Sequence, residues 1–145
     1  MYITDSIQIN ITSSSFQSNA LQPHNGGSGG AIALYIGSAI TITSCNFTSN
    51  VAGGSWTSGG AIAVIDYTGV TLSNLLFSLN NNTGTDMTAR SLYISDNSVA
   101  TLKSATFPTS SLPYVVAPYE VYVDASSNLT SCTLGSDAMT AKVRI

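Results

Sequence analysis

A 30-residue internal repeat constrains this chain more than any other feature of its sequence. One column of the repeat consists of phenylalanines separated by 31, 30 and 30 residues, at Phe16, Phe47, Phe77 and Phe107. A second column is aliphatic, with spacings of 30, 30 and 29 residues, at Ile32, Ile62, Leu92 and Val121. Self-similarity at a fixed period of this size is typical of architectures in which each repeat buries its apolar face against its neighbours. Four copies in register therefore predict a stacked solenoid.

Each repeat contains two short segments with the pattern of β-strands. The first precedes the phenylalanine and alternates aliphatic with polar residues, at 9–12, 40–43, 70–73 and 100–103, with a weaker echo at 127–130. The second carries aliphatic pairs two positions apart, at Ile32/Leu34, Ile62/Val64, Leu92/Ile94 and Val121/Val123. Period-two alternation turns these aliphatic side chains inward, and no helical period is present. We expect an all-β, right-handed parallel β-helix with about 30 residues per coil, roughly four to five coils, and Gly/Ser/Asn-rich loops between the two strands.

Two further columns are best explained as scaffold. Asn19, Asn50 and Asn80 each follow a phenylalanine by three residues, where stacked amides can hydrogen-bond successive coils. Paired glycines at 29–30 and 59–60 stand just before the second strand, where a corner needs positive φ or close backbone approach. We interpret both columns as structural.

Composition limits the partners and the location of the chain. Only 8% of the residues are charged, 43% are hydrophobic, and the formal net charge is −3. The four basic residues form no stripe that could hold a phosphate backbone, so we expect no nucleic-acid partner. No apolar run reaches the ~18 residues of a membrane-spanning helix, so we expect no membrane span in this segment.

Four sequons suggest N-glycosylation, at Asn10, Asn46, Asn81 and Asn128. Together with the low charge they favour an extracellular or cell-surface glycoprotein. Residues 1–5 form neither a basic leader nor an apolar signal core. We therefore expect this sequence to be a fragment of a longer protein.

The pairing of Phe-x-x-Asn with Gly-Gly-Ala-Ile resembles the repeat of the chlamydial polymorphic membrane proteins. Three Phe-x-x-Asn copies (Phe16/Asn19, Phe47/Asn50 and Phe77/Asn80) and two Gly-Gly-Ala-Ile copies carry the resemblance, over roughly residues 6–95. The resemblance implies a pectin-lyase-like parallel β-helix and an adhesin-like surface location. From Phe107 onward the motif departs, because Pro108 follows the phenylalanine and no Asn stands three residues later.

The cysteines and the histidine have structural explanations. Cys45 and Cys132 occupy equivalent columns three coils apart, hence roughly 14 Å from each other at strand spacing. A disulfide needs Cα atoms within about 7 Å, so we expect two free, small core residues. His24, the sole histidine, is expected to be an exposed loop residue without a catalytic role.

Carboxylates are the strongest candidates for chemistry. Asp66 and Asp96 are 30 residues apart, so they should stack in adjacent coils, where two carboxylates can hold a cation or raise one pKa. The first coil has Tyr35 at the equivalent place, and no basic partner joins the pair, so we favour solvated turn residues. We predict no catalytic residue, no cofactor and no metal site.

Two surface features remain open as contact sites. Outward threonines at Thr41, Thr71 and Thr101 form a short array of the kind that orders water in ice-binding proteins, although strand propensity explains them equally well. Trp56 lies in a Gly-rich loop and is a possible ligand contact, or it folds back over the core.

The functional hypotheses follow from the repeat. We expect one β-helix domain over 1–145, with regular coils at about 6–107 and degenerate coils at 108–145. Open strand edges at both ends should stack on other protein subunits or on further coils, and should make the isolated chain oligomeric or aggregation-prone. The first hypothesis is a non-catalytic structural or adhesive module of a cell-surface or fibrillar assembly, with glycans as further possible partners. The alternatives are a carbohydrate-binding solenoid and, last, a polysaccharide-active enzyme.

Overall fold

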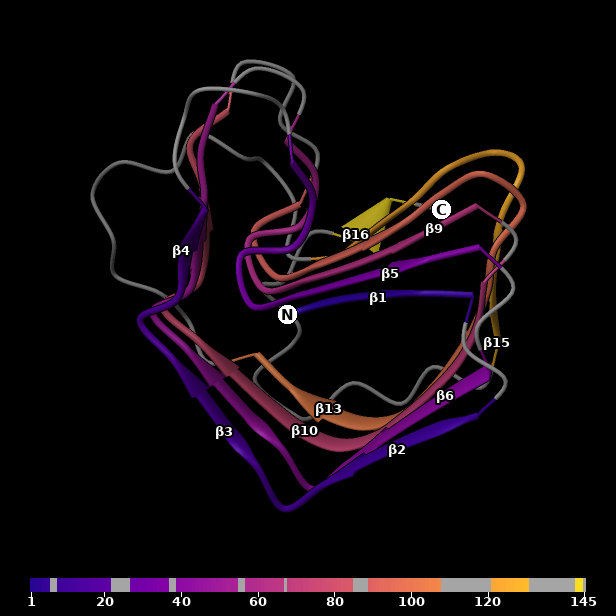
Figure 1. Cartoon of the computed structure of the whole chain (residues 1–145), viewed down its shortest axis with the longest axis horizontal. Coiled ribbons are helices and arrows are strands. Elements are labelled where there is room, and N and C mark those ends of the chain that lie inside the picture. Colours follow the sequence, from indigo (N-terminus) through magenta and orange to yellow (C-terminus); the bar gives the residue numbers. More distant parts are fainter. Residues whose placement is uncertain are drawn as a thin grey trace.

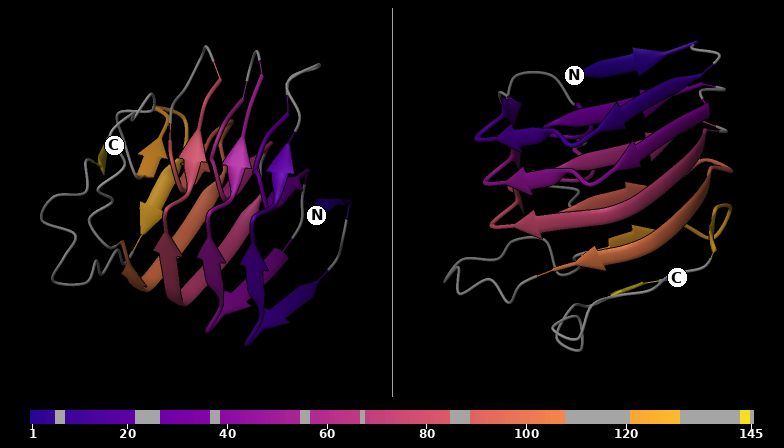
Figure 2. Two further views of the ribbon diagram at one scale, coloured as in Figure 1. Left: turned by 90° about the vertical axis from the view of Figure 1, so that its left-hand side faces the viewer. Right: turned by 90° about the horizontal axis from the view of Figure 1, so that it is seen from below.

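The computed structural model shows an all-β parallel solenoid. It describes residues 1–5, 8–21, 27–36, 39–54, 57–66, 68–84, 89–107, 121–130 and 143–144. Every strand pairing among these residues is parallel, and none of them is helical. Successive coils lie on one another as rungs, and the described part amounts to about three turns with further strands continuing the pairing (Figure 2). The predicted fold class is confirmed.

Three parallel sheets form the walls, here called sheets A, B and C (Figure 1). Sheet A contains β1 (Tyr2–Thr4), β5 (Ile32–Tyr35), β9 (Ile62–Ile65), β12 (Leu92–Ile94), β14 (Val121–Val123) and β16 (Val143–Arg144). Sheet B contains β2 (Ile9–Thr12), β6 (Ala39–Thr43), β10 (Gly69–Ser78), β13 (Val99–Thr106) and β15 (Asn128–Thr130), with β3 (Ser15–Gln17) and β7 (Asn46–Thr48) continuing it around a bend. Sheet C consists of β4 (Ala20–Leu21), β8 (Val51–Ala52) and β11 (Asn81–Asn82).

The register places the predicted columns on top of one another. Ile32 pairs with Ile62, Ile62 with Leu92, and Leu92 with Val121. The four phenylalanine rings stack with centroid separations of 4.9, 5.2 and 4.9 Å, which are favourable distances for offset stacking. Cys45 is fully buried and free, as predicted, within the same core. Cys132 and His24 lie outside the described residues.

Sheet C corrects the expectation that loops alone connect the two predicted strands. Residues directly after the asparagine column pair across three coils, with Ala20 beside Val51 and Val51 beside Asn81. Each of these strands is two residues long, so it is too short to show a period-two pattern. Parallel pairing with the neighbouring coils, rather than local sequence, makes these residues strands.

The corners of the coil use left-handed backbone conformations. Four columns have positive φ in the described coils: Asp5/Ile36/Asp66/Asp96, Ser13/Ser44/Asn74/Ser104, Ser18/Ser49/Leu79 and Gly29/Gly59. Asn, Asp and Gly tolerate this region, whereas a Cβ-branched side chain is strained there. The polar composition of the chain is therefore partly a consequence of how often each coil must turn.

Ile36 is the exception that gives a stability prediction. Its φ is 50° and its side chain is 52% exposed, so it contributes strain and little burial. We expect Ile36→Asn to stabilise the fold by about 1 kcal/mol, because Asn tolerates the left-handed region. The midpoint of urea unfolding measures the gain. Ile36→Val keeps the β-branch and serves as the matched control; an equal gain in both variants would contradict the explanation.

Candidate functional site

The asparagine column forms a continuous hydrogen-bonded ladder. The Asn50 Nδ2 donates to the Phe16 carbonyl at 2.9 Å and to the Asn80 Oδ1 at 3.0 Å. Its Oδ1 accepts from the backbone N–H of Asn19 at 3.1 Å and from the Asn19 Nδ2 at 2.9 Å. Asn80 repeats the pattern, donating to the Phe47 carbonyl at 2.9 Å. The predicted ladder is confirmed, and each buried amide bonds both the coil before it and the coil after it.

The first full coil leaves this ladder open at the N-terminal end of the stack. Asn19 is exposed, whereas Asn50 and Asn80 are 0% and 3% exposed. Ile9, Ile11 and Phe16, which belong to the core columns, are only partly buried. Beside Asn19 lies a hollow of about 480 Å³ that is also lined by Tyr2, Ala20 and Tyr35. Within the described residues, this end combines apolar side chains with unfilled ladder positions.

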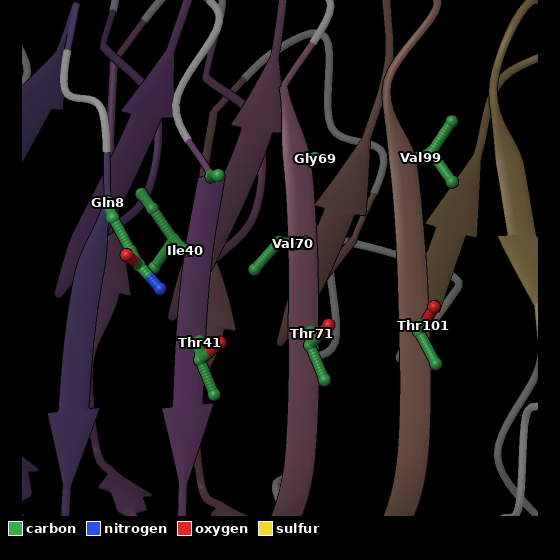
Figure 3. Close-up of a pocket in the computed structure, with 9 residues that line it drawn as sticks. Gln8, Ile40, Thr41, Gly69, Val70, Thr71, Val99 and Thr101 are labelled. Atoms are coloured by element: carbon green, nitrogen blue, oxygen red, sulfur yellow. The ribbon is translucent and has the colours of Figure 1, made fainter.

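The outer face of sheet B carries a shallow trough of about 330 Å³ (Figure 3). Thr41, Thr71 and Thr101 lie in one row along its side, from three adjacent strands. Some hydroxyls of this face hydrogen-bond each other, as Thr101 does with Thr130 at 3.0 Å and Thr43 with Ser73 at 3.0 Å. The floor is uneven, because Gly69 stands between Ala39 and Val99. The predicted threonine array exists, but on a surface that is furrowed beside it.

The outer face of sheet A carries tyrosines that the sequence analysis did not single out. Tyr93 and Tyr122 stack with centroids 5.5 Å apart, and Tyr2 and Tyr35 lie 5.1 Å apart. Partial burial raises the pKa of Tyr35, against the effect of a hydrogen bond with Ser28. The spacing of Tyr93 and Tyr122 matches the repeat, and that spacing was the signal that could have identified this pair.

The aspartates lie at corners, as predicted, but one expected equivalence was wrong. Tyr35 pairs with Ile65, so the position equivalent to Asp66 in the first coil is Ile36 and not Tyr35. Asp66 and Asp96 follow paired positions in adjacent coils and both have a φ of 57°. The Asp96 carboxylate accepts from Ser95 Oγ at 2.8 Å, and its N–H donates to Asp124 Oδ2 at 3.0 Å. Two of these bonds tie neighbouring corner residues together.

Asp124 has the one carboxyl in the described residues whose pKa is clearly shifted. Partial burial raises the pKa of this carboxyl, but hydrogen bonds from the Asp96 N–H and from Ser126 and Ser127 offset that effect and leave the pKa below its ordinary value. The ionised form is therefore favoured in the folded state. The contribution of this carboxylate to stability is present above the unfolded pKa and decreases as the pH falls through the folded pKa.

The sequon asparagines occupy different environments. Asn10, Asn46 and Asn128 are exposed and lie on strands of sheet B. Asn81 is partly buried, and its Oδ1 is buried without a hydrogen-bond partner. Its neighbour Asn82 is fully buried and holds Thr57, which donates to the Asn82 Oδ1 at 2.8 Å. Trp56 lies outside the described residues.

Comparisons with protein-family models, with curated proteins and with solved structures found no match to this chain. Among the described residues, no group of three or more His, Cys, Asp or Glu side chains could hold a metal ion. In the same part of the chain no helix is long and apolar enough to cross a membrane. The fold and the ladders define a parallel β-solenoid whose recurrent polar side chains bind coil to coil.

Proposed function

We propose that this chain is a structural or adhesive module of an assembly outside the cell, and that its β-solenoid serves as a rigid, regular scaffold. The observation that carries the proposal is the buried Asn50–Asn80 ladder. Both amides are fully engaged in bonds between coils, and the phenylalanine stack runs beside them. A chain that places its recurrent polar groups in the stack itself gains a single, well-defined register along the axis.

Surface chemistry supports the extracellular part of the proposal. The three outward sequon asparagines lie on sheet B, where a glycan can project into solvent without disturbing the core. Asn81 offers no such freedom, because its side-chain oxygen is enclosed. The exposed hydroxyl and amide face is also suited to many weak contacts, which an adhesive surface uses in place of one deep pocket. The motif resemblance to the chlamydial surface repeat points the same way.

The proposal predicts a specific glycosylation pattern in the endogenous protein. We expect peptide N-glycosidase to lower its apparent mass, with glycans mapped by mass spectrometry to Asn10, Asn46 or Asn128 and none at Asn81. Antibody should label intact, unpermeabilised cells. An endogenous protein that is unglycosylated and unlabelled until the cells are opened would contradict the extracellular assignment.

A parallel assay separates the scaffold from its alternatives. We expect no depolymerisation of polygalacturonate or other polysaccharides by the purified chain. Cleavage that is lost in both Asp66→Ala and Asp96→Ala would instead establish the enzyme. Polysaccharide affinity without cleavage, lost in Tyr122→Ala but kept in Tyr122→Phe, would establish carbohydrate binding on the stacked tyrosines of sheet A, since aromatic faces stack on sugar rings.

A further inference from the structure

We infer that the N-terminal end of the stack is a docking site for an extended segment of another polypeptide that carries the same coil pattern, aliphatic-x-aliphatic followed by Phe-x-x-Asn. This inference rests on the proposed structural role and names the partner of that role by its chemistry. The surface consists of the outer edges of β2, β3 and β4 together with Ile11, Phe16 and Asn19.

Hydrogen bonds inside the stack specify what the open end can accept. In each inner coil the Asn Oδ1 receives two donors from the preceding Asn, its backbone N–H and its Nδ2, as Asn50 does from Asn19. The Nδ2 of that same amide also donates to the phenylalanine carbonyl of the preceding coil, as Asn50 does to Phe16. Asn19 repeats neither bond toward a preceding coil within the described residues. Its side chain therefore matches one acceptor and two donors of an incoming Phe-x-x-Asn segment.

The backbone at this end points to the same partner. Val51 donates its N–H to the Asn19 carbonyl at 2.9 Å, and Asn81 donates to the Asn50 carbonyl at 2.9 Å. Ala20 is the equivalent residue of the first coil, and its N–H faces the open end, where no described residue accepts it. Unpaired strand edges of this kind bind extended segments by strand addition.

Apolar burial supplies the remaining specificity. Phe47 and Phe77, each stacked between two other rings, are 0% and 2% exposed, whereas Phe16 has a ring on one side and is partly exposed. Ile9 and Ile11 are partly exposed at the same end, whereas Ile40 and Ile42 below them are buried. A segment with an aliphatic pair before its phenylalanine would continue both columns, in the geometry that already joins the coils of this chain.

The test uses a fluorescent peptide of residues 40–50 with Cys45→Ser, added to the full chain and followed by anisotropy. We expect saturable binding, weakened on the order of tenfold or more when the peptide carries Asn50→Ala, because three hydrogen bonds are lost. Asn19→Ala in the protein should weaken binding to a similar extent. Asn128→Ala, on the outer face of sheet B, is the matched control and should bind the peptide as well as the unmodified chain does.

The peptide variants keep the test decisive even where a protein variant folds poorly, because they leave the protein unchanged. If the chain associates with itself through this end, excess peptide should dissociate the oligomers and the Asn50→Ala peptide should not. Absence of saturable binding, or equal binding of both peptides, overturns the inference. Such a failure would leave the glycan pattern of the endogenous protein untouched, and an unglycosylated protein would leave the peptide result untouched, so the two proposals fail separately.

Discussion

Gly60→Ala should destabilise the solenoid by about 3 kcal/mol or more, which we expect to be among the largest effects of any single methyl group added to this chain. A Cβ at Gly60 would lie 2.0 Å from the carbonyl oxygen of Arg90 and 2.3 Å from that of Asn81. Both obstacles are backbone atoms in the next coil, so neither can rotate away. Relief requires the coils to separate, and separation breaks parallel pairing on both sides of the corner.

Gly69→Ala is the matched control for this prediction. A Cβ at Gly69 meets no atom within 4 Å, although the residue lies in the middle of sheet B. Alanine also costs less backbone entropy than glycine in a strand, so we expect a change between zero and about 1 kcal/mol of stabilisation. Urea unfolding monitored by circular dichroism compares the two, with equal m-values required for a valid comparison. Similar losses in both variants would mean that close approach at Gly60 is not what the glycine provides.

Much of the fold could be predicted from the repeat because a solenoid repeats its environment as well as its sequence. Phe47 has a phenylalanine above and below it, and Ile62 has Ile32 and Leu92, so a column in the alignment becomes a column in space. Alternation then decides which side chains face inward. The Asn50 ladder was predictable for the same reason, since equal spacing leaves equal positions at each bend.

The parts that could not be predicted depend on neighbouring coils rather than on local pattern. Sheet C is made of two-residue strands that contain no periodic signal. Ile36 adopts a left-handed corner that its own preference opposes, because the coil must turn where Asp66 turns below it. Tyr35 was aligned one residue out of place, since the first two coils differ in length between their phenylalanine columns by one residue.

The candidate surfaces were less predictable than the scaffold. Spacing alone placed Asn19 in a column, but only the pattern of donors and acceptors shows that its amide is the incomplete member. Likewise, Asn81 and Asn128 are equivalent as sequons, and only burial of the Asn81 oxygen separates them. A surface is defined by what fails to repeat, which a search for repetition does not find.

Asn50→Ala should cost about 3–5 kcal/mol, more than any other change in the asparagine ladder. The substitution leaves the Phe16 carbonyl, the Asn80 Oδ1 and the amide donors of Asn19 without their partner, and Asn50 itself is fully buried. Asn19→Ala removes donors to one residue at the exposed end, so we expect about 1 kcal/mol. Urea unfolding of both variants measures the difference.

The double variant distinguishes a ladder from a row of independent amides. Asn19 and Asn50 bond each other directly, so once Asn50 is removed Asn19 has little left to lose within the described stack. The combined loss should therefore fall short of the sum of the single losses by about 0.5–1 kcal/mol. Additive losses would show that Asn50 acts through its other neighbours alone. Coupling would show that each amide holds the next in place, which is the property that an incoming Phe-x-x-Asn segment would use at the open end.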